Sequence, residues 1–122
     1  MIQEIKLNLG GKDRLFTFGL TFLGELMERY DPLTLEEIIL KAVKFPAKYV
    51  PSLMFESLRN TTLMNKEVVD FEEIDIKIWL EQEESLGAEK ITTFLTTFLE
   101  TTENKTKVED IEVVDAEEVK KK

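Results

Sequence analysis

Apolar and polar residues first alternate along the chain and then change to a helical spacing. Residues 5–9 alternate strictly, with leucine and isoleucine at every second position, as in a strand with one buried face. Gly10-Gly11 supplies a turn, and residues 15–18 form a second short apolar run. Two such runs around a Gly-Gly turn predict a β-hairpin over residues 2–18. A hairpin alone is marginally stable in water, so we expect it to pack against the segment that follows.

Five later segments carry apolar residues at the three- and four-residue spacing of a helix. They predict helices over about residues 21–30, 34–44, 51–63, 71–82 and 86–101. In the fourth of these, the predicted apolar stripe consists of Phe71, Ile74 and Ile78, with Trp79 as an optional member. In the fifth, the stripe consists of Ile91, Phe94, Leu95, Phe98 and Leu99.

The expected helix starts depend on capping residues. Thr21 is a candidate N-cap for the first helix, and Thr34 with Glu37 forms a capping box for the second. Pro51 fits the first turn of the third helix, where its missing N–H is tolerated. Asp70 begins a capping pattern for the fourth helix, and Ser85 is a candidate cap for the last one.

The character of the chain changes after the last helical segment. Residues 103–122 are dense in charge and lack aromatic residues, which predicts a flexible, acidic tail. A short strand over residues 110–114 is the alternative. The sequence therefore predicts one mainly α (α+β) domain over residues 1–102, with an N-terminal hairpin packed on a bundle of four to five short helices.

Composition limits the chemistry available to the protein. The 122 residues include neither cysteine nor histidine, so the usual general base, thiolate nucleophile and transition-metal ligands are missing. No nucleotide-binding loop or serine-hydrolase motif is present. We therefore expect no enzymatic activity and no cofactor. The net charge of −9 would repel nucleic acid and anionic membranes, so neither is an expected partner.

Two other features bear on localisation and metal binding. No apolar run approaches a membrane span and the N-terminus lacks the pattern of a signal peptide, so we expect a cytoplasmic protein. The carboxylates of Asp70, Glu72, Glu73 and Asp75 could suggest a metal site. Their spacing does not match an EF-hand loop, and helix capping explains it better.

Aromatic residues and methionine gather beside two prolines between residues 45 and 55. Such residues suit adaptable binding surfaces, although filling the core at a helix-to-helix corner is the favoured interpretation. Trp79 has the same two alternative roles, in the core or on a binding surface, because the neighbours Ile78 and Trp79 cannot both face the centre of the core. The candidate partner-binding residues are Phe45, Tyr49, Met54 and Trp79.

In this order the elements resemble the tail assembly chaperones of long-tailed (siphovirus-type) phages and prophages of Gram-positive bacteria. The resemblance covers about residues 2 to 102. It is carried by the hairpin IKLNLGGKDRLFTF, the opening helix FGLTFLGELMERYD, the proline-started helix PSLMFESLRNTTLM and the acidic helix DFEEIDIKIWLEQ. An amphipathic helix and a lysine-ended polar tail follow them.

The resemblance implies a protein that binds the tape-measure protein, keeps it soluble, recruits tail-tube subunits and is absent from the mature virion. It also implies the cytoplasm of the bacterial host as the place of action, and weak homo-oligomers fit this role. In such families a ribosomal frameshift can produce a longer form that contacts the tube protein. Consecutive lysine codons for residues 120–122 could provide the slippery site.

Three other functions are compatible with a small acidic domain. The first is a structural tail-completion or head–tail connector protein of the virion. The second is a DNA mimic, which would need carboxylates arrayed along one face, whereas here they are spread over helix caps and the tail. The third, an enzyme, is disfavoured by the missing residue types.

Overall fold

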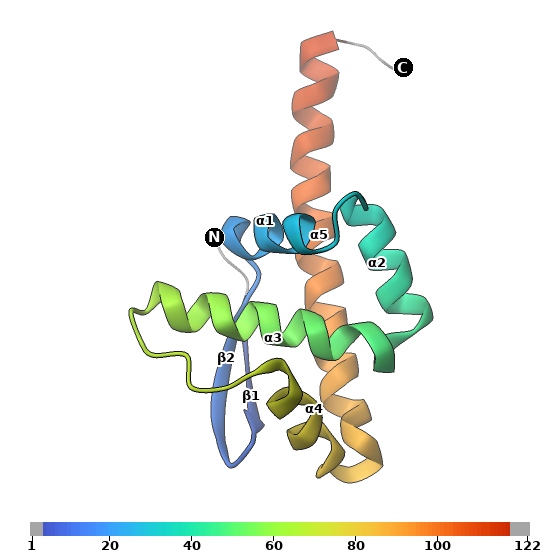
Figure 1. The fold of residues 1–122 in the computed structure, drawn as a ribbon. Helices are drawn as coiled ribbons and strands as arrows, with labels where there is room; N and C mark the ends of the chain where they lie inside the picture. Colours follow the sequence, from blue (N-terminus) through green and yellow to red (C-terminus); the bar gives the residue numbers. More distant parts are fainter. Residues whose placement is uncertain (1–3, 118–122) are drawn as a thin grey trace.

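A β-hairpin opens the chain and is followed by helices that cross one another at steep angles (Figure 1). The computed structural model describes the backbone of residues 4–117 and the side chains of residues 4–102. The elements are β1 (Glu4–Leu9), β2 (Lys12–Thr17), α1 (Leu20–Arg29), α2 (Leu35–Lys44), α3 (Pro46–Met64), α4 (Glu73–Glu81), the 3-10 turn η1 (Glu84–Gly87) and α5 (Ala88–Glu117). The mainly helical class with an N-terminal hairpin is therefore confirmed.

The hairpin turn is the one that the glycine pair predicts. Leu9 pairs with Lys12 at the end of the antiparallel ladder, and the two residues between them have φ of +66° (Gly10) and +87° (Gly11). Left-handed angles at both central positions match the right-handed twist of the flanking strands.

Strand β2 joins the helices through a buried polar contact with α3. The Thr17 and Thr61 hydroxyl oxygens lie 2.7 Å apart, and the backbone N–H of Thr17 donates to Thr61 Oγ1 at 3.2 Å. The Ser57 hydroxyl donates to the Thr17 carbonyl at 2.8 Å. These bonds satisfy the backbone N–H and the carbonyl of Thr17, the last residue of β2.

Phenylalanine rings form the centre of the core. Neighbouring ring centroids lie between 5.0 and 6.5 Å apart, mostly edge to face or tilted, which is the favoured geometry of aromatic pairs. The rings belong to Phe16 of β2, Phe18 directly after that strand, Phe22 of α1, and Phe94 and Phe98 of α5. The Phe18–Phe22 pair joins the link after β2 to α1. Helix α1 and the hairpin each pack mainly on α3, so the expectation that the hairpin packs against the segment directly after it is wrong.

One of the two threonine caps predicted from the sequence is present. Thr34 and Glu37 form the expected capping box: the Glu37 N–H donates to Thr34 Oγ1 at 3.2 Å, and the Thr34 N–H donates to Glu37 Oε1 at 2.8 Å. The prediction for Thr21 is wrong, because α1 begins one residue earlier, at Leu20, with Gly19 as its N-cap. Gly19 has φ of −90° and no side chain to donate or accept.

Helix α3 begins earlier than predicted. Its first residue is Pro46, so Pro51 lies inside the helix and not in its first turn. Because Pro51 has no backbone N–H, the carbonyl of Ala47 receives no hydrogen bond from it. Ala47 is exposed, so water can reach this carbonyl. A single lost hydrogen bond near the helix start is tolerated because the buried face of α3 continues on both sides of Pro51.

Helix α4 differs from the prediction in its start and in its buried face. It begins at Glu73, with Glu72 and not Asp70 as N-cap, and Asp75 Oδ2 accepts from the Glu72 N–H at 2.8 Å. Ile76 and Leu80 are buried, whereas Ile74 and Ile78 of the predicted stripe are exposed. The isoleucines and leucine recur every second residue, which gives a helix two opposite apolar faces, and only one of them can enter the core.

The last helix begins at Ala88 rather than at residue 86, and Ser85 lies in the preceding turn. Its backbone continues to Glu117, beyond the predicted end near residue 101, and projects from the body of the protein (Figure 1). The strand considered over residues 110–114 is therefore wrong, because the backbone of this segment is helical. Residues 118–122 of the predicted tail lie outside the described part of the chain.

Candidate partner-binding surface

A groove lined by apolar side chains runs along the outer face of α4. It has a volume of about 360 Å³ and lies between α4, the start of α3, η1 and the start of α5. Its lining consists of Ala47, Pro51, Ile74, Lys77, Ile78, Leu80, Glu81, Leu86 and Ile91. We call this surface the α4 groove. Ile74, Ile78 and Leu86 are exposed there, at 54%, 41% and 66%.

A second apolar hollow lies at the corner between α2 and α3. It has a volume of about 350 Å³ and is lined by Leu33, Glu37, Leu40, Lys41, Lys44 and Phe45. Phe45 and Leu40 are exposed, as is Val43 nearby in sequence. We call this surface the α2 corner. Ala47 of the α4 groove follows Phe45 by two residues, so the two surfaces are close along the chain.

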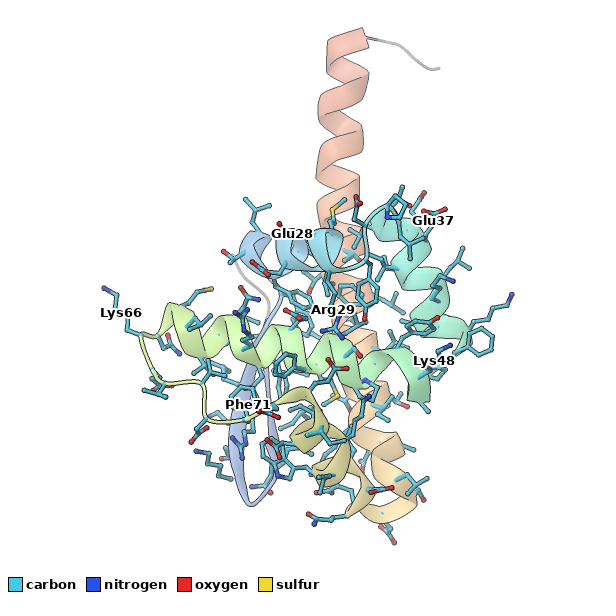
Figure 2. All side chains as sticks on the ribbon, viewed as in Figure 1. Glu28, Arg29, Glu37, Lys48, Lys66 and Phe71 are labelled. Carbon is cyan, nitrogen blue, oxygen red and sulfur yellow. The ribbon has the colours of Figure 1, made fainter. Side chains whose placement is uncertain are left out.

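A partly exposed ion-pair network fixes α4 against the body beside the groove. The Arg29 guanidinium contacts Glu56 at 2.8 Å and Glu73 at 2.7 Å, and so joins α1, α3 and α4. The Ser52 hydroxyl donates to the other oxygen of Glu73 at 2.6 Å. Figure 2 shows Arg29 in the space between α1 and α3. The network holds the first turn of α4 in place and thereby sets the position of Ile74.

The network perturbs its ionisable groups. Burial alone would raise the pKa of Glu73, but the Ser52 hydrogen bond and Arg29 outweigh it and lower that pKa. Burial disfavours charge on Arg29 as well, yet its bonds to Glu73 and Glu56 raise its pKa. Burial raises the pKa of Tyr30. These shifts follow from structural ion pairing, and the groups do not line the α4 groove.

The structure separates the four residues predicted to bind a partner. Phe45 is exposed at the α2 corner. Tyr49 is half-buried, with the ammonium groups of Lys48 and Lys41 at 5.3 and 5.9 Å from its ring centroid. Met54 is fully buried in the core and cannot reach a partner in the folded protein. Met54 shares its face of α3 with Leu53 and Leu58, and that face packs into the core.

Trp79 is a structural residue of the hairpin interface. Its ring lies 4.1 Å from the Arg14 guanidinium carbon and 6.4 Å from the Phe71 ring. Arg14 is buried, donates from Nε to the Leu9 carbonyl at 2.8 Å, and has a pKa lowered by burial. Of the neighbouring pair, Ile78 is therefore the residue that points outward. The sequence-based prediction placed Trp79 and not Ile78 among the partner-binding residues, whereas it is Ile78 that lines the α4 groove.

A third cleft is polar and lies between the hairpin, the end of α3 and the loop that leads to α4. Its volume is about 490 Å³, and positive side chains (Lys12, Arg14) and negative ones (Asp13, Glu67, Asp70) line it together. Phe71 forms part of its wall (Figure 2). Over the described residues, no group of three or more metal-ligating side chains is assembled. The described side chains of this cleft therefore carry charges of both signs and form no cluster of metal ligands.

Two further observations complete the description. Among the described residues, no helix has both the length and the apolar character that crossing a membrane requires. Comparison of the chain with protein-family models, with curated proteins and with solved structures finds no match.

Proposed function

We propose that this protein is a tail assembly chaperone of a long-tailed phage or prophage, which binds the tape-measure protein and keeps it soluble until the tail tube forms around it. It acts by covering apolar surface, and no bond is made or broken. In the same scheme it brings tail-tube subunits to the tape-measure protein, and a frameshifted longer form is a candidate for that second contact.

The observation that carries the proposal is the α4 groove. Ile74 and Ile78 are held in the open by α4, whose opposite face is buried and whose first turn is fixed by ion pairs. Leu86 of η1 is exposed in the same groove. An apolar groove between helices suits the apolar stripe of an amphipathic helix. A tape-measure protein is a long helical chain whose stripes lack partners before assembly.

The remaining surface suits a soluble holder. The net charge of −9 keeps copies of the protein apart and counters aggregation. Because many copies can line one long chain, each contact needs only weak affinity. The α2 corner offers a second apolar contact close to the first.

The proposal is tested by co-expressing the chain with the long helical protein encoded beside it. We expect the wild type to keep that protein in the soluble fraction and to elute with it from a sizing column. The double variant Ile74→Ser/Ile78→Ser should lose both effects at an unchanged melting temperature. Leu20→Ser is the matched control, because Leu20 is also exposed, at 81%, but lies on α1.

Two results would contradict the proposal. One is failure of the wild-type protein to associate with the tape-measure protein. The other is stoichiometric amounts of the chain in purified virions, measured by mass spectrometry, since that would indicate a structural component of the tail.

A further inference from the structure

The turn between α4 and α5 holds three consecutive residues in the left-handed region. Ser85, Leu86 and Gly87 have φ of 52°, 56° and 75°. L-residues avoid this region because Cβ comes too close to the following carbonyl oxygen. For Ser85 and Leu86 the conformation is therefore strained, and it persists only because the surroundings impose it.

The end of this turn packs closely against α4 at Gly87. A Cβ on Gly87 would lie 2.6 Å from Leu80 Cδ2 and 3.1 Å from Leu80 Cβ, so the backbone of the turn presses directly on α4. Leu80 itself is buried. The turn therefore cannot shift toward α4.

The strained turn directs Leu86 away from the core. Two thirds of this leucine (66%) is exposed, and it lines the α4 groove opposite the isoleucines of α4. A strained backbone that presents a large apolar side chain to water contributes little to folding. Such conformations gather at sites that bind something.

The rim of the groove near Leu86 is acidic. Glu81 lines the groove and Glu84 begins the strained turn, and across the described residues neither forms an ion pair. Lys77 is the cation that lines the groove, and it lies 3.7 Å from Glu73. The free charge at this rim is therefore negative, which favours a partner that carries positive charge beside its apolar residues.

We propose that the η1 turn is a recognition element: Leu86, Ile74 and Ile78 hold the apolar stripe of a partner helix, and Glu81 and Glu84 select a stripe bordered by lysine or arginine. The inference rests on the proposed function and names the surface and the chemistry of the segment bound. A helix matches the groove because side chains at i, i+3, i+4 and i+7 form one narrow apolar ridge.

The partner chemistry is tested with two synthetic peptides of about 20 residues, long enough to form a helix. Both carry the same leucine stripe, bordered by lysine in one and by glutamate in the other. We expect the lysine-bordered peptide to bind about tenfold more tightly at low salt, and the difference to shrink at high salt. Equal affinities, or self-association of the chain through this groove in sedimentation, would overturn the assignment.

The role of the turn is tested with Leu86→Gly and its matched control Ser85→Gly. Glycine relieves the left-handed strain at both positions, so the melting temperature should rise by about 2–4 °C for Ser85→Gly and should not fall for Leu86→Gly. Only Leu86→Gly should weaken binding of the lysine-bordered peptide, by about tenfold. A loss of affinity without a loss of stability separates recognition from folding, and unchanged affinity in Leu86→Gly rejects the proposal.

Charge reversal at the rim gives an independent measurement. Glu84→Lys should reduce the preference for the lysine-bordered peptide at least about threefold, whereas Glu28→Lys on α1 should not. Figure 2 shows Glu28 on α1, on the other side of α3 from α4. No change with Glu84→Lys contradicts the acidic rim.

Failure of this inference and failure of the proposed function give different results. If Leu86→Gly still keeps the tape-measure protein soluble, the chaperone function stands and this surface is rejected. If the wild type binds the lysine-bordered peptide but not the tape-measure protein, the surface stands and the function is rejected.

Discussion

Single residues at the hairpin turn decide how the sheet meets the helices. Gly10 and Gly11 both need positive φ, but their surroundings differ. A Cβ on Gly10 would lie 2.5 Å from Trp79 Cε2, whereas a Cβ on Gly11 would meet nothing within 4 Å. Trp79 cannot retreat easily, because Arg14 lies over its ring. Gly10 is therefore needed for packing as well as for the turn.

Gly10→Ala should accordingly destabilise the protein more than Gly11→Ala. We expect a loss of about 2–3 kcal/mol for Gly10→Ala, from backbone strain plus overpacking, and about 1 kcal/mol for Gly11→Ala, from strain alone. Urea denaturation followed by Trp79 fluorescence measures both values. Equal losses would mean that the indole moves aside without penalty.

At the scale of elements, α4 is the decisive helix. Its inward face (Ile76, Leu80) joins the core, and its outward face (Ile74, Ile78) lines the groove. The position of the helix depends on Arg29 of α1 and Ser52 of α3, which both bind Glu73. Since this carboxylate is charged in the folded protein and its pKa is lowered, α4 docking contributes stability that depends on pH.

Glu73→Gln should therefore lower stability near neutral pH and lose its effect in acid. A depressed folded-state pKa gives stability that is present above the unfolded value, about 4.3, and is lost as the pH falls through the folded value. We expect Glu73→Gln to lower the free energy of unfolding by about 1–2 kcal/mol near pH 7. The difference in unfolding free energy between the variant and the wild type should narrow as the pH falls below the unfolded value.

Denaturation curves at several pH values measure that gap directly. Glu28→Gln is a suitable control, because Glu28 is exposed on α1 and should behave like the wild type throughout. If the difference in unfolding free energy between the wild type and Glu73→Gln stays constant from neutral pH into acid, Glu73 contributes through packing and not through its charge.

For the whole molecule, aromatic side chains divide into a buried cluster and an exposed minority. Phe16, Phe18, Phe22, Phe94 and Phe98 form the cluster that joins β2, α1 and α5. Phe45, by contrast, is 55% exposed at the α2 corner. The same residue type therefore serves stability at one place and is available for binding at another.

The same substitution should have opposite consequences at these two places. Phe98→Ala leaves a cavity among the rings and should lower the free energy of unfolding by about 3–5 kcal/mol, a large share of the stability of such a domain. Phe45→Ala should change it by about 0.5 kcal/mol or less while weakening association with the tape-measure protein. Thermal denaturation and co-purification separate the two effects. A large loss of stability in Phe45→Ala would assign that ring to the fold.

Local pattern is enough to predict most of the elements of this protein. The alternation over residues 5–9, the glycine pair and the Thr34–Glu37 box each depend on neighbours within a few residues, so the hairpin and the start of α2 follow from the sequence. The stripe containing Phe94 and Phe98 is apolar on one side only, so its burial follows as well. For these segments, local preference and packing favour the same structure.

Packing between distant segments settles the rest. Isoleucine and leucine recur every second residue in α4, so its two faces are nearly equivalent by sequence, and contact with α3 and the hairpin selects the face that is buried. Met54 is buried because its face of α3 packs into the core, and Gly87 leaves no room for a side chain because it lies against Leu80 of α4. The amino-acid order thus sets which segments are helix or strand, through interactions within a few residues. The binding surface comes from the folded chain, because which apolar side chains stay in water depends on what the other helices cover.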